Sequence, residues 1–443
     1  FPSLEREIRS ELTAKAEKQA ISVFSANLRQ LLLQQPIGGH TVLGLDPGYR
    51  TGCKAAVVNP QGRVLAIDTL YLTGSQHQQD EAEQKFIKLV KNNGVTLVAM
   101  GNGTASYETE EFTAKLIAKY KLNISYVIAS EAGASVYSAS KLAREELPDL
   151  DVSLRGAVSI ARRIQDPLAE LVKIEPKAIG VGQYQHDVNQ KELGEALGQV
   201  VESCVNHVGV DLNTASPALL SYVAGVSSTV AKNIITYRNE NGAFKNRKQL
   251  LKVPRLGPAA FTQCAGFLRI QNGTEPLDNT SVHPESYKLT ESILTKLGCQ
   301  AESCTAPGVQ LLAAKADPAP LAAELQAGLP TVTDILQALA KPGRDPREDS
   351  PAPLSRKKVT KLSDLKIGSI VKGTVQNVVD FGCFVDIGLK VSGLVHRSEL
   401  THKRFRHPLD VVSVGQIVDA MIISIDEKRN RIGLSLKQVP QEK

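Results

Sequence analysis

The sequence predicts a multidomain protein that joins an α/β domain, an all-α region and a small all-β domain. Residues 41–175 contain three short apolar strands followed by alternating helices and strands, and residues 190–345 contain helices separated by Gly and Pro. Residues 366–437 return to short strands with Gly turns, the pattern of a small barrel. A length of 443 residues accommodates two to four domains, at roughly 100–200 residues each. No apolar run approaches the ~20 residues of a membrane span, so no transmembrane helix is predicted.

Residues 1–38 are predicted to form a connecting helix. Apolar residues recur at helical spacing and form a stripe, namely Leu4, Ile8, Leu12, Ile21, Phe24, Leu28 and Leu31. The segment 36–39, with one Pro and two Gly, ends the pattern. Because the sequence starts without Met inside a helical pattern, we expect a longer protein whose N-terminal region is missing here.

Residues 39–189 are predicted to form the α/β domain. Three strands come first, at 41–45, 54–59 and 63–71, followed by a helix at 80–91, a strand at 96–100, a helix at 108–120, a strand at 124–129 and helices near 132–146 and 154–173. Three antiparallel strands followed by alternating helices and strands indicate an RNase H-like layer fold.

Three carboxylates are candidate catalytic residues and metal ligands in this domain. Asp46 ends the first strand before a Gly-bearing turn, Glu131 follows the strand at 124–129, and Asp166 lies on the last helix. A two-metal nuclease uses about three acidic groups to hold Mg²⁺ ions ~4 Å apart across a scissile phosphate. The alternative is that these acids are helix caps and surface charges in an inactive fold. His186, in the irregular stretch after Gly182, is a general base, a ligand or a structural residue.

Residues 190–272 resemble tandem helix-hairpin-helix modules, and residues 273–345 form a second helical module. Gly225 and Gly257 lie in the two hairpins, which present backbone N–H groups to phosphates in modules of this kind. The usual hairpin is Gly-hydrophobe-Gly, but Ser227 replaces the second glycine of one hairpin and Arg255 the first of the other. Binding and packing roles therefore both stay open.

Residues 346–364 are predicted to be a Pro-rich linker, and residues 365–438 look like an S1-type OB-fold barrel. Base stacking is expected from three aromatic side chains, Phe381, Phe384 and His396. Phosphate contacts are expected from Lys372, Arg404, Arg429 and Arg431. Because strand side chains alternate, both phenylalanines cannot lie inside the barrel, and we expect one of them in its core.

The positive charge is concentrated in this last region. Residues 356–438 contain 15 Lys and Arg against 8 Asp and Glu, whereas the remainder contains 37 against 38. A basic domain attached to a neutral body is typical of a nucleic-acid contact. The six cysteines include no CxxC pair, which argues against a zinc site.

Several motifs extend the resemblance to nearly the whole chain. The segment 44–48 with Glu131 and Asp166 resembles YqgF/RuvC-type resolvase domains, and residues 44–48 alone also resemble the first phosphate loop of sugar-kinase and actin-type ATPases. Together with the hairpins and the S1-type domain, four segments resemble the bacterial Tex family: DPGYRTGCK (46–54), GNGT (101–104), QDPLA (165–169) and GQYQHD (182–187).

The resemblance to the Tex family implies a cytoplasmic transcription accessory factor. Such a factor would bind single-stranded RNA or DNA largely without sequence specificity, with RNA polymerase or another transcription complex as partner. It would need no cofactor, and its YqgF-like domain would be catalytically silent. The alternative is a Mg²⁺-dependent, structure-specific nuclease that uses Asp46, Glu131 and Asp166.

Overall fold

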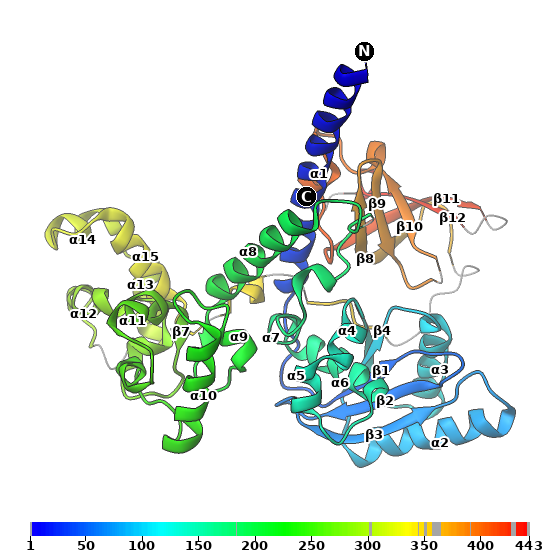
Figure 1. The fold of residues 1–443 in the computed structure, drawn as a ribbon, viewed down its shortest axis with the longest axis horizontal. Coiled ribbons are helices and arrows are strands. Elements are labelled where there is room, and N and C mark those ends of the chain that lie inside the picture. The colour runs from blue at the N-terminus through cyan, green and yellow to red at the C-terminus, as the bar shows by residue number, and fades with distance from the viewer. Residues whose placement is uncertain are drawn as a thin grey trace. The chain divides into compact units, whose positions relative to one another are not determined.

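The structure is a computed structural model that describes residues 2–182, 184–300, 304–343, 345–349, 352–356, 365–389, 391–426 and 431–440 (Figure 1). The chain divides into two compact units. The first unit comprises Phe1–Val200 and Asp349–Lys443, and the second comprises Val201–Glu348. The first unit contains a long helix, the α/β domain and the barrel, and the second is mainly helical.

The α/β domain is built on a five-stranded sheet with the strand order β3-β2-β1-β4-β5. Its strands are β1 (Val42–Asp46), β2 (Cys53–Val58), β3 (Val64–Leu70), β4 (Leu97–Gly101) and β5 (Ser125–Ala129). β2 pairs antiparallel with both β1 and β3, whereas β4 pairs parallel with β1 and β5. The predicted opening of three antiparallel strands and the mixed α/β class are confirmed.

Helices cover both faces of this sheet. α2 (Gln76–Asn92) and α3 (Ser106–Lys119) share one apolar core with the strands, and α6 (Val152–Gln165) packs in a second core on the other face. α6 approaches β1 so closely that a Cβ at Gly44 would lie 2.2 Å from the carbonyl oxygen of Ala157. A glycine at this position is therefore required for the contact between helix and sheet.

Two helices expected to be continuous are each divided by a capping residue. The region near 132–146 forms α4 (Ala134–Ala139) and α5 (Lys141–Glu146), with Ser140 as the N-cap of α5. The region 154–173 forms α6 and α7 (Pro167–Leu171), with Asp166 between them. Pro167 has no N–H to donate, so the first helix ends and Asp166 caps the second.

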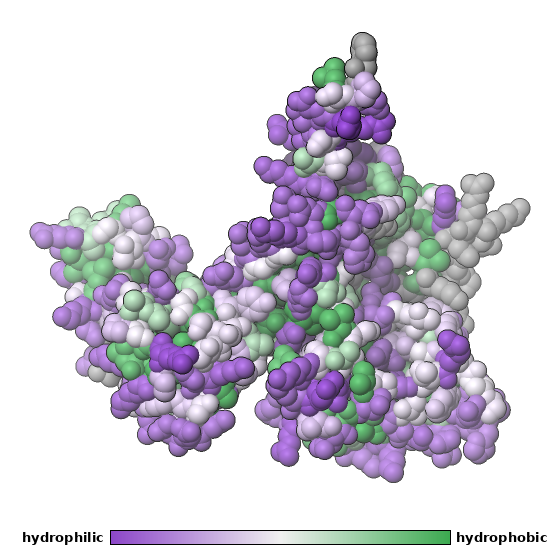
Figure 2. Space-filling model, viewed as in Figure 1, coloured by the Kyte–Doolittle hydropathy of each residue, from purple (hydrophilic) through white to green (hydrophobic). Residues whose placement is uncertain are grey.

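The N-terminal helix α1 spans Pro2–Leu32. Its second half is packed, since Phe24, Leu28 and Leu32 are buried. In its first half, Leu4, Ile8 and Leu12 are 49–60% exposed. Figure 2 shows isolated hydrophobic residues on a mostly hydrophilic surface in this half of α1. The apolar stripe that the sequence predicts is thus covered only in the second half of the helix.

The C-terminal domain is a closed barrel with the strand order β10-β12-β11-β8-β9. Its strands are β8 (Ile370–Val379), β9 (Gly382–Asp386), β10 (Gly393–His396), β11 (Ile417–Asp426) and β12 (Arg431–Ser435). Inward-facing aliphatic side chains fill its core, including Val375, Val385, Val395, Ile422 and Leu434. This architecture confirms the predicted OB-like barrel.

Arg356 ties the barrel to the α/β domain. Its backbone forms a two-way bridge with Tyr126 on β5, with N···O distances of 2.8 and 2.9 Å. Its guanidinium lies 3.5 Å from Glu110 Oε1 on α3 and 3.2 Å from Asp386 Oδ2 on β9. Part of the predicted linker is therefore fixed to both domains, while positions 350–351 and 357–364 lie outside the described residues.

The second unit contains short helices and one small parallel pair of strands. The helices are α8 (Gln190–Val208), whose second half belongs to this unit, α9 (Pro217–Leu220), α10 (Ser228–Asn241), α11 (Pro258–Cys264), α12 (Tyr287–Lys296), α13 (Pro307–Lys315), α14 (Pro318–Glu324) and α15 (Leu329–Ala340). β6 (Val210–Asp211) pairs with β7 (Leu268–Arg269). Arg247 is buried and donates hydrogen bonds to the carbonyls of Leu268, Thr280 and Val282. This arginine joins segments that short helices alone would leave weakly connected.

Candidate functional site

Two of the three candidate carboxylates meet at one edge of the sheet. β1, β4 and β5 are parallel, so Asp46 at the end of β1 and Glu131 just after β5 come to the same edge. The Glu131 carboxylate lies against the backbone after β4, because a Cβ at Gly103 would fall 1.7 Å from its Oε1. The glycines at 101 and 103 thus make room for the glutamate.

Burial changes the acidity of both carboxyl groups. Burial, and secondarily the charge of Glu131, raise the pKa of Asp46 to about 6, whereas Lys54 and Arg163 oppose this rise. Burial also raises the pKa of Glu131, against a hydrogen bond from the Gly103 backbone and the charge of Arg163. The two acids therefore form a partly buried pair that favours holding a proton.

Two cations of the chain itself accompany this pair. Lys54 is the register partner of Asp46 on β2, and its ammonium donates to the carbonyls of Thr51 and Gly52. Arg163 on α6 is buried and donates to the carbonyls of Ser130, at 2.5 Å, and Ala132, at 3.1 Å. Arg163 consequently holds the loop that carries Glu131.

Asp166 does not join the pair. Its carboxylate accepts a hydrogen bond from the Ala169 N–H at 3.1 Å and caps α7. The position of α6 that faces Asp46 is Gly156, where a Cβ would lie 2.5 Å from Asp46 Oδ2. Asp166 follows Gly156 by ten residues, or about 15 Å of helix rise. The prediction that Asp166 lies close to Asp46 is therefore wrong.

The residues at this edge do not fit a two-metal centre. Such a centre needs about three acidic groups. Here Asp46 and Glu131 lie beside the guanidinium of Arg163, and the third acid that interacts with Arg163, Glu170, is paired with Lys173 at 2.9 Å. Throughout the described part of the chain, no group of three His, Cys, Asp or Glu side chains is arranged to hold a metal ion. We derive no catalytic step through Mg²⁺ from this geometry.

His186 lies exposed at the surface, next to a buried glutamine. Gln185 donates to the carbonyls of Lys177 and Ile179 and accepts from the Val181 N–H. The buried, hydrogen-bonded residue that holds this loop together is therefore Gln185, and not His186.

The barrel presents an aromatic pair on its outer surface. The ring centroids of Phe381 and Phe384 lie 6.2 Å apart with the planes at 89°, an edge-to-face arrangement. Phe381 is 50% exposed and Phe384 is half-buried, whereas Cys383 and Val385 point into the barrel core. The expectation that one phenylalanine belongs to the core is wrong, because the inward positions of β9 are taken by Cys383 and Val385.

His396 lies next to this pair. It is exposed and pairs in register with Gly382, two residues from Phe384 on the same face of β9. Gly382 has φ +153°, and a Cβ there would lie 2.1 Å from the Val395 carbonyl oxygen. The glycine thus allows β10 to bring His396 beside the aromatic rings. The ring nitrogen Nδ1 of His396 lies 2.9 Å from Ser398 Oγ, which fixes the imidazole.

The predicted basic residues lie at different distances from the aromatic pair. Lys372 is exposed on β8, five residues before Asn377, the register partner of Phe384, or about 16 Å along the strand. Arg431 is exposed at the start of β12, two residues before Gly433. Gly433 pairs with Leu394 on β10, and Leu394 pairs in turn with Phe384 on β9. Arg404 is exposed in the loop before Pro408, and Arg429 lies outside the described residues.

Sequence reasoning missed a cation in this region. The Arg397 guanidinium lies over the Phe405 ring, 5.5 Å from its centroid, and the Arg397 N–H donates to the Phe381 carbonyl at 2.8 Å. Arg397 directly follows His396, which was predicted to stack on bases, and this position in the sequence could have identified it as a further basic residue of the site.

The hairpin glycines differ in their surroundings. Gly225 has φ +79°, and a Cβ there would lie 2.7 Å from the Cβ of Gln263 on α11, so this glycine serves close packing. Gly257 caps α11, and a Cβ at this position would meet open space, with nothing within 4 Å. Ser227 caps α10 through a bond from the Val230 N–H. Phosphate binding at both hairpins remains a prediction.

Arg255 occupies a backbone conformation that favours glycine, with φ +67°. We expect Arg255→Gly to raise the free energy of unfolding of the second unit by about 0.5–1 kcal/mol, because relief of the left-handed strain exceeds the added chain entropy. Urea denaturation of the full chain measures this change. Arg255→Lys, which keeps the strain, is the control, and an equal gain in that variant would contradict the explanation.

Family comparisons agree with this domain arrangement. Residues 40–165 match the Tex protein YqgF-like domain, 205–269 a helix-hairpin-helix motif, 275–347 an HHH domain and 364–437 an S1 RNA binding domain. This set defines a multidomain protein with nucleic-acid-binding modules.

The chain is similar to proteins of the Tex family over nearly its whole length. It is 55% identical to "Uncharacterized protein YdcI" of Bacillus subtilis, covering 98% of this chain and 60% of that protein. Its identity to the "Transcriptional accessory protein Tex" of Neisseria gonorrhoeae is 50%, covering 99% and 57%. The human "S1 RNA-binding domain-containing protein 1" is 41% identical, covering 99% and 50%. The chain thus spans 50–60% of the length of these relatives.

Among solved structures, GSP13 from Bacillus subtilis is 33% identical, covering 18% of this chain and 62% of its own, with a TM-score of 0.17.

Within the described residues, no helix has the length and apolar character to cross a membrane.

Proposed function

We propose that this chain is a nucleic-acid-binding factor that binds single-stranded RNA or DNA largely without sequence specificity. The observation that carries the proposal is the edge-to-face pair on the outside of the barrel, formed by the exposed Phe381 and the half-buried Phe384, with His396 beside it. Every base has a π-face, so aromatic side chains stack on any sequence. The basic residues of the barrel supply contacts to phosphates, which fix the strand without reading its bases.

The helix-hairpin-helix region is proposed to support this binding. Backbone N–H groups at such hairpins contact phosphates and carry no sequence information. In this chain the support is expected mainly from the hairpin at Gly257, because Gly225 is packed against α11.

The names of relatives suggest the setting in which the chain acts. One relative is named as a transcriptional accessory protein. We therefore propose a cytoplasmic factor whose partner is RNA polymerase or another transcription complex. A pull-down with the purified chain in the presence and absence of a nuclease tests whether such an association depends on bound nucleic acid.

The salt dependence of binding tests the role of the barrel. Replacing Lys372, Arg404 and Arg431 together by alanine is expected to reduce the slope of log affinity against log salt by about 2, because each lost contact to a single strand removes about 0.7. Fluorescence anisotropy with labelled single-stranded RNA and DNA measures the slope. Replacing Lys88, Lys115 and Arg144, which are exposed on the α/β domain, is the matched control. If the slope of log affinity against log salt is equal in both triple variants, the strand binds at a surface other than that of the barrel.

We propose binding without cleavage. The alternative nuclease function rests on Asp46 and Glu131, which meet at the sheet edge beside Arg163. Incubating the chain with labelled branched DNA and RNA, with and without Mg²⁺ or Mn²⁺, distinguishes the two functions. We expect intact substrates under all conditions. Metal-dependent cleavage that Asp46→Asn abolishes would overturn the proposal.

A further inference from the structure

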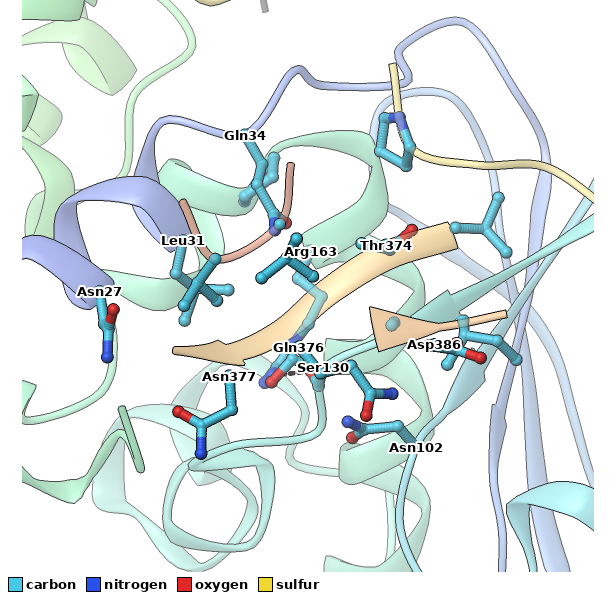
Figure 3. Close-up of a pocket in the computed structure, with 18 of the residues that line it drawn as sticks. Asn27, Leu31, Gln34, Asn102, Ser130, Arg163, Thr374, Gln376, Asn377 and Asp386 are labelled. Carbon is cyan, nitrogen blue, oxygen red and sulfur yellow. Dashed lines mark hydrogen bonds between the residues drawn. The ribbon is translucent and has the colours of Figure 1, made fainter. Parts of the chain in front are cut away.

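A cavity of about 520 Å³ lies inside the first unit, and neither Phe381 nor Phe384 lines it. Its walls come from α1, the end of β5, α6, the segment 180–182 and strand β8 (Figure 3). Sites for small molecules usually have volumes of about 300–1,000 Å³. The size therefore suits one small ligand, and neither the aromatic pair nor the hairpins use this space.

Primary amides dominate the polar part of the lining. Five of them come from three separate segments of the chain, namely Asn27, Gln34, Asn102, Gln376 and Asn377. A primary amide carries both hydrogen-bond donors and an acceptor, and the oxygens of Asn102 and Gln376 already accept from the Glu131 N–H and the Ser392 hydroxyl. Aliphatic side chains such as Leu31, Ile164 and Leu171 complete the walls. Such a lining suits a ligand with donors and acceptors along its edge and apolar faces.

Two buried polar atoms of the lining have no hydrogen-bond partner within the described part of the chain: Arg163 Nε and Asn27 Oδ1. Both side chains are otherwise anchored. Asn27 Nδ2 donates to the Val181 carbonyl at 2.7 Å, and the terminal nitrogens of Arg163 donate to Ser130, Ala132 and Ser159. The cavity thus offers one fixed donor and one fixed acceptor, and a buried polar group without a partner is costly.

The charges around the cavity argue against an anionic ligand. Arg163 interacts with Glu170, Glu131 and Asp46, and Arg356 is paired with Glu110 and Asp386. Both guanidinium groups of the lining are therefore already compensated by carboxylates of the chain. A phosphate would find no uncompensated positive charge in the cavity, whereas an uncharged polar heterocycle needs none.

We propose that this cavity binds an uncharged nucleobase. A nucleobase presents donors and acceptors along its edge and apolar faces to either side. It would accept a hydrogen bond from Arg163 Nε, donate to Asn27 Oδ1 and contact the aliphatic walls. The base comes either from a free nucleoside or from a nucleotide of a strand held by the chain. This site goes beyond the proposed strand-binding function and does not depend on the aromatic pair.

Equilibrium dialysis of the full chain against adenosine, guanosine, cytidine and uridine tests this proposal. At least one nucleoside is expected to bind with a Kd on the order of 0.1–1 mM, as ligand efficiency predicts for its size. The Kd is expected to stay unchanged between about 50 and 500 mM salt, because no counterions are released. Asn377→Leu, on the half-exposed part of β8, and Leu31→Trp, which fills the cavity, are each expected to weaken binding at least about tenfold. Asn123→Leu, at an exposed asparagine outside the cavity, is the matched control.

A saturating single-stranded oligonucleotide distinguishes the two sources of the base. Displacement of the nucleoside indicates a base of the strand, and simultaneous binding indicates a free nucleoside; both results support the proposal. No binding of any nucleoside up to about 10 mM would overturn it, as would equal affinity in Asn377→Leu, Leu31→Trp and the parent chain. Strand binding with no nucleoside binding would refute the cavity site alone and leave the proposed function in place.

Discussion

Replacing Phe381 and Phe384 together by alanine is expected to lower the affinity for single-stranded RNA and DNA about 100-fold. Stacking contributes ~1–3 kcal/mol per base, and every 1.4 kcal/mol corresponds to a tenfold change in affinity. The rings are in edge-to-face contact, so each one also positions the other. The effects of the two single variants are therefore not expected to add up to that of the double variant.

Fluorescence anisotropy with labelled homopolymeric strands measures this loss. The slope of log affinity against log salt is expected to stay the same, because the basic residues that contact phosphates are intact. Tyr71→Ala, which removes a 40%-exposed aromatic side chain from the α/β domain, is the control. The single variant Phe381→Tyr, which keeps an aromatic ring, is expected to retain most of the affinity of the parent chain. Wild-type affinity in the double variant would show that the strand binds elsewhere.

The barrel surface was predictable because its signals are local. The alternation along β9 places Cys383 and Val385 inside, and this alone brings Phe384 to the outer face. The position of His396 depends on the pairing of β9 with β10, which requires a glycine at 382. The sequence alone shows that residue 382 is a glycine, but it does not show which strand lies against that glycine.

The carboxylate site was predictable only in part. Asp46 and Glu131 follow strands, and the order of strands in the sheet brings strand ends together. Asp166 was assigned to the same site from its presence on the last helix, although Asp-Pro is also a helix-capping pattern. The position that faces Asp46 is Gly156, and a glycine gives no chemical signal in a sequence.

The cavity was not predictable from the sequence. Its amides come from α1 and the turn after it, the loop after β4 and strand β8, which are distant in the chain. An isolated Asn or Gln in any of these segments is ordinary surface composition. Only the packing of α1 and the barrel on the α/β domain collects them, and Arg356 stabilises that packing through Glu110 and Asp386.

Asp46→Asn is expected to stabilise the chain near pH 7. Burial raises the pKa of Asp46 to about 6, against an ordinary value of 3.8. Between these two values the folded chain binds more protons than the unfolded chain, so the free energy of unfolding falls as the pH rises from about 4 to 6. The asparagine variant lacks this decrease. Its gain at pH 7 is expected to be about 1–3 kcal/mol, since one pKa unit corresponds to about 1.4 kcal/mol and the lost attraction of Lys54 and Arg163 reduces the benefit.

Urea denaturation between about pH 4 and pH 8 measures this difference as a function of pH. The two proteins are expected to converge below about pH 4, where Asp46 is protonated in both the folded and the unfolded chain. Asp187→Asn, at an exposed aspartate, controls for the loss of one negative charge. Repeating the measurement with Mg²⁺ separates the two interpretations of the carboxylate pair. A metal site would stabilise the parent chain at pH 7 and not the Asp46→Asn variant, whereas a buried acid pair held by Lys54 and Arg163 predicts that the variant stays the more stable protein with and without the ion.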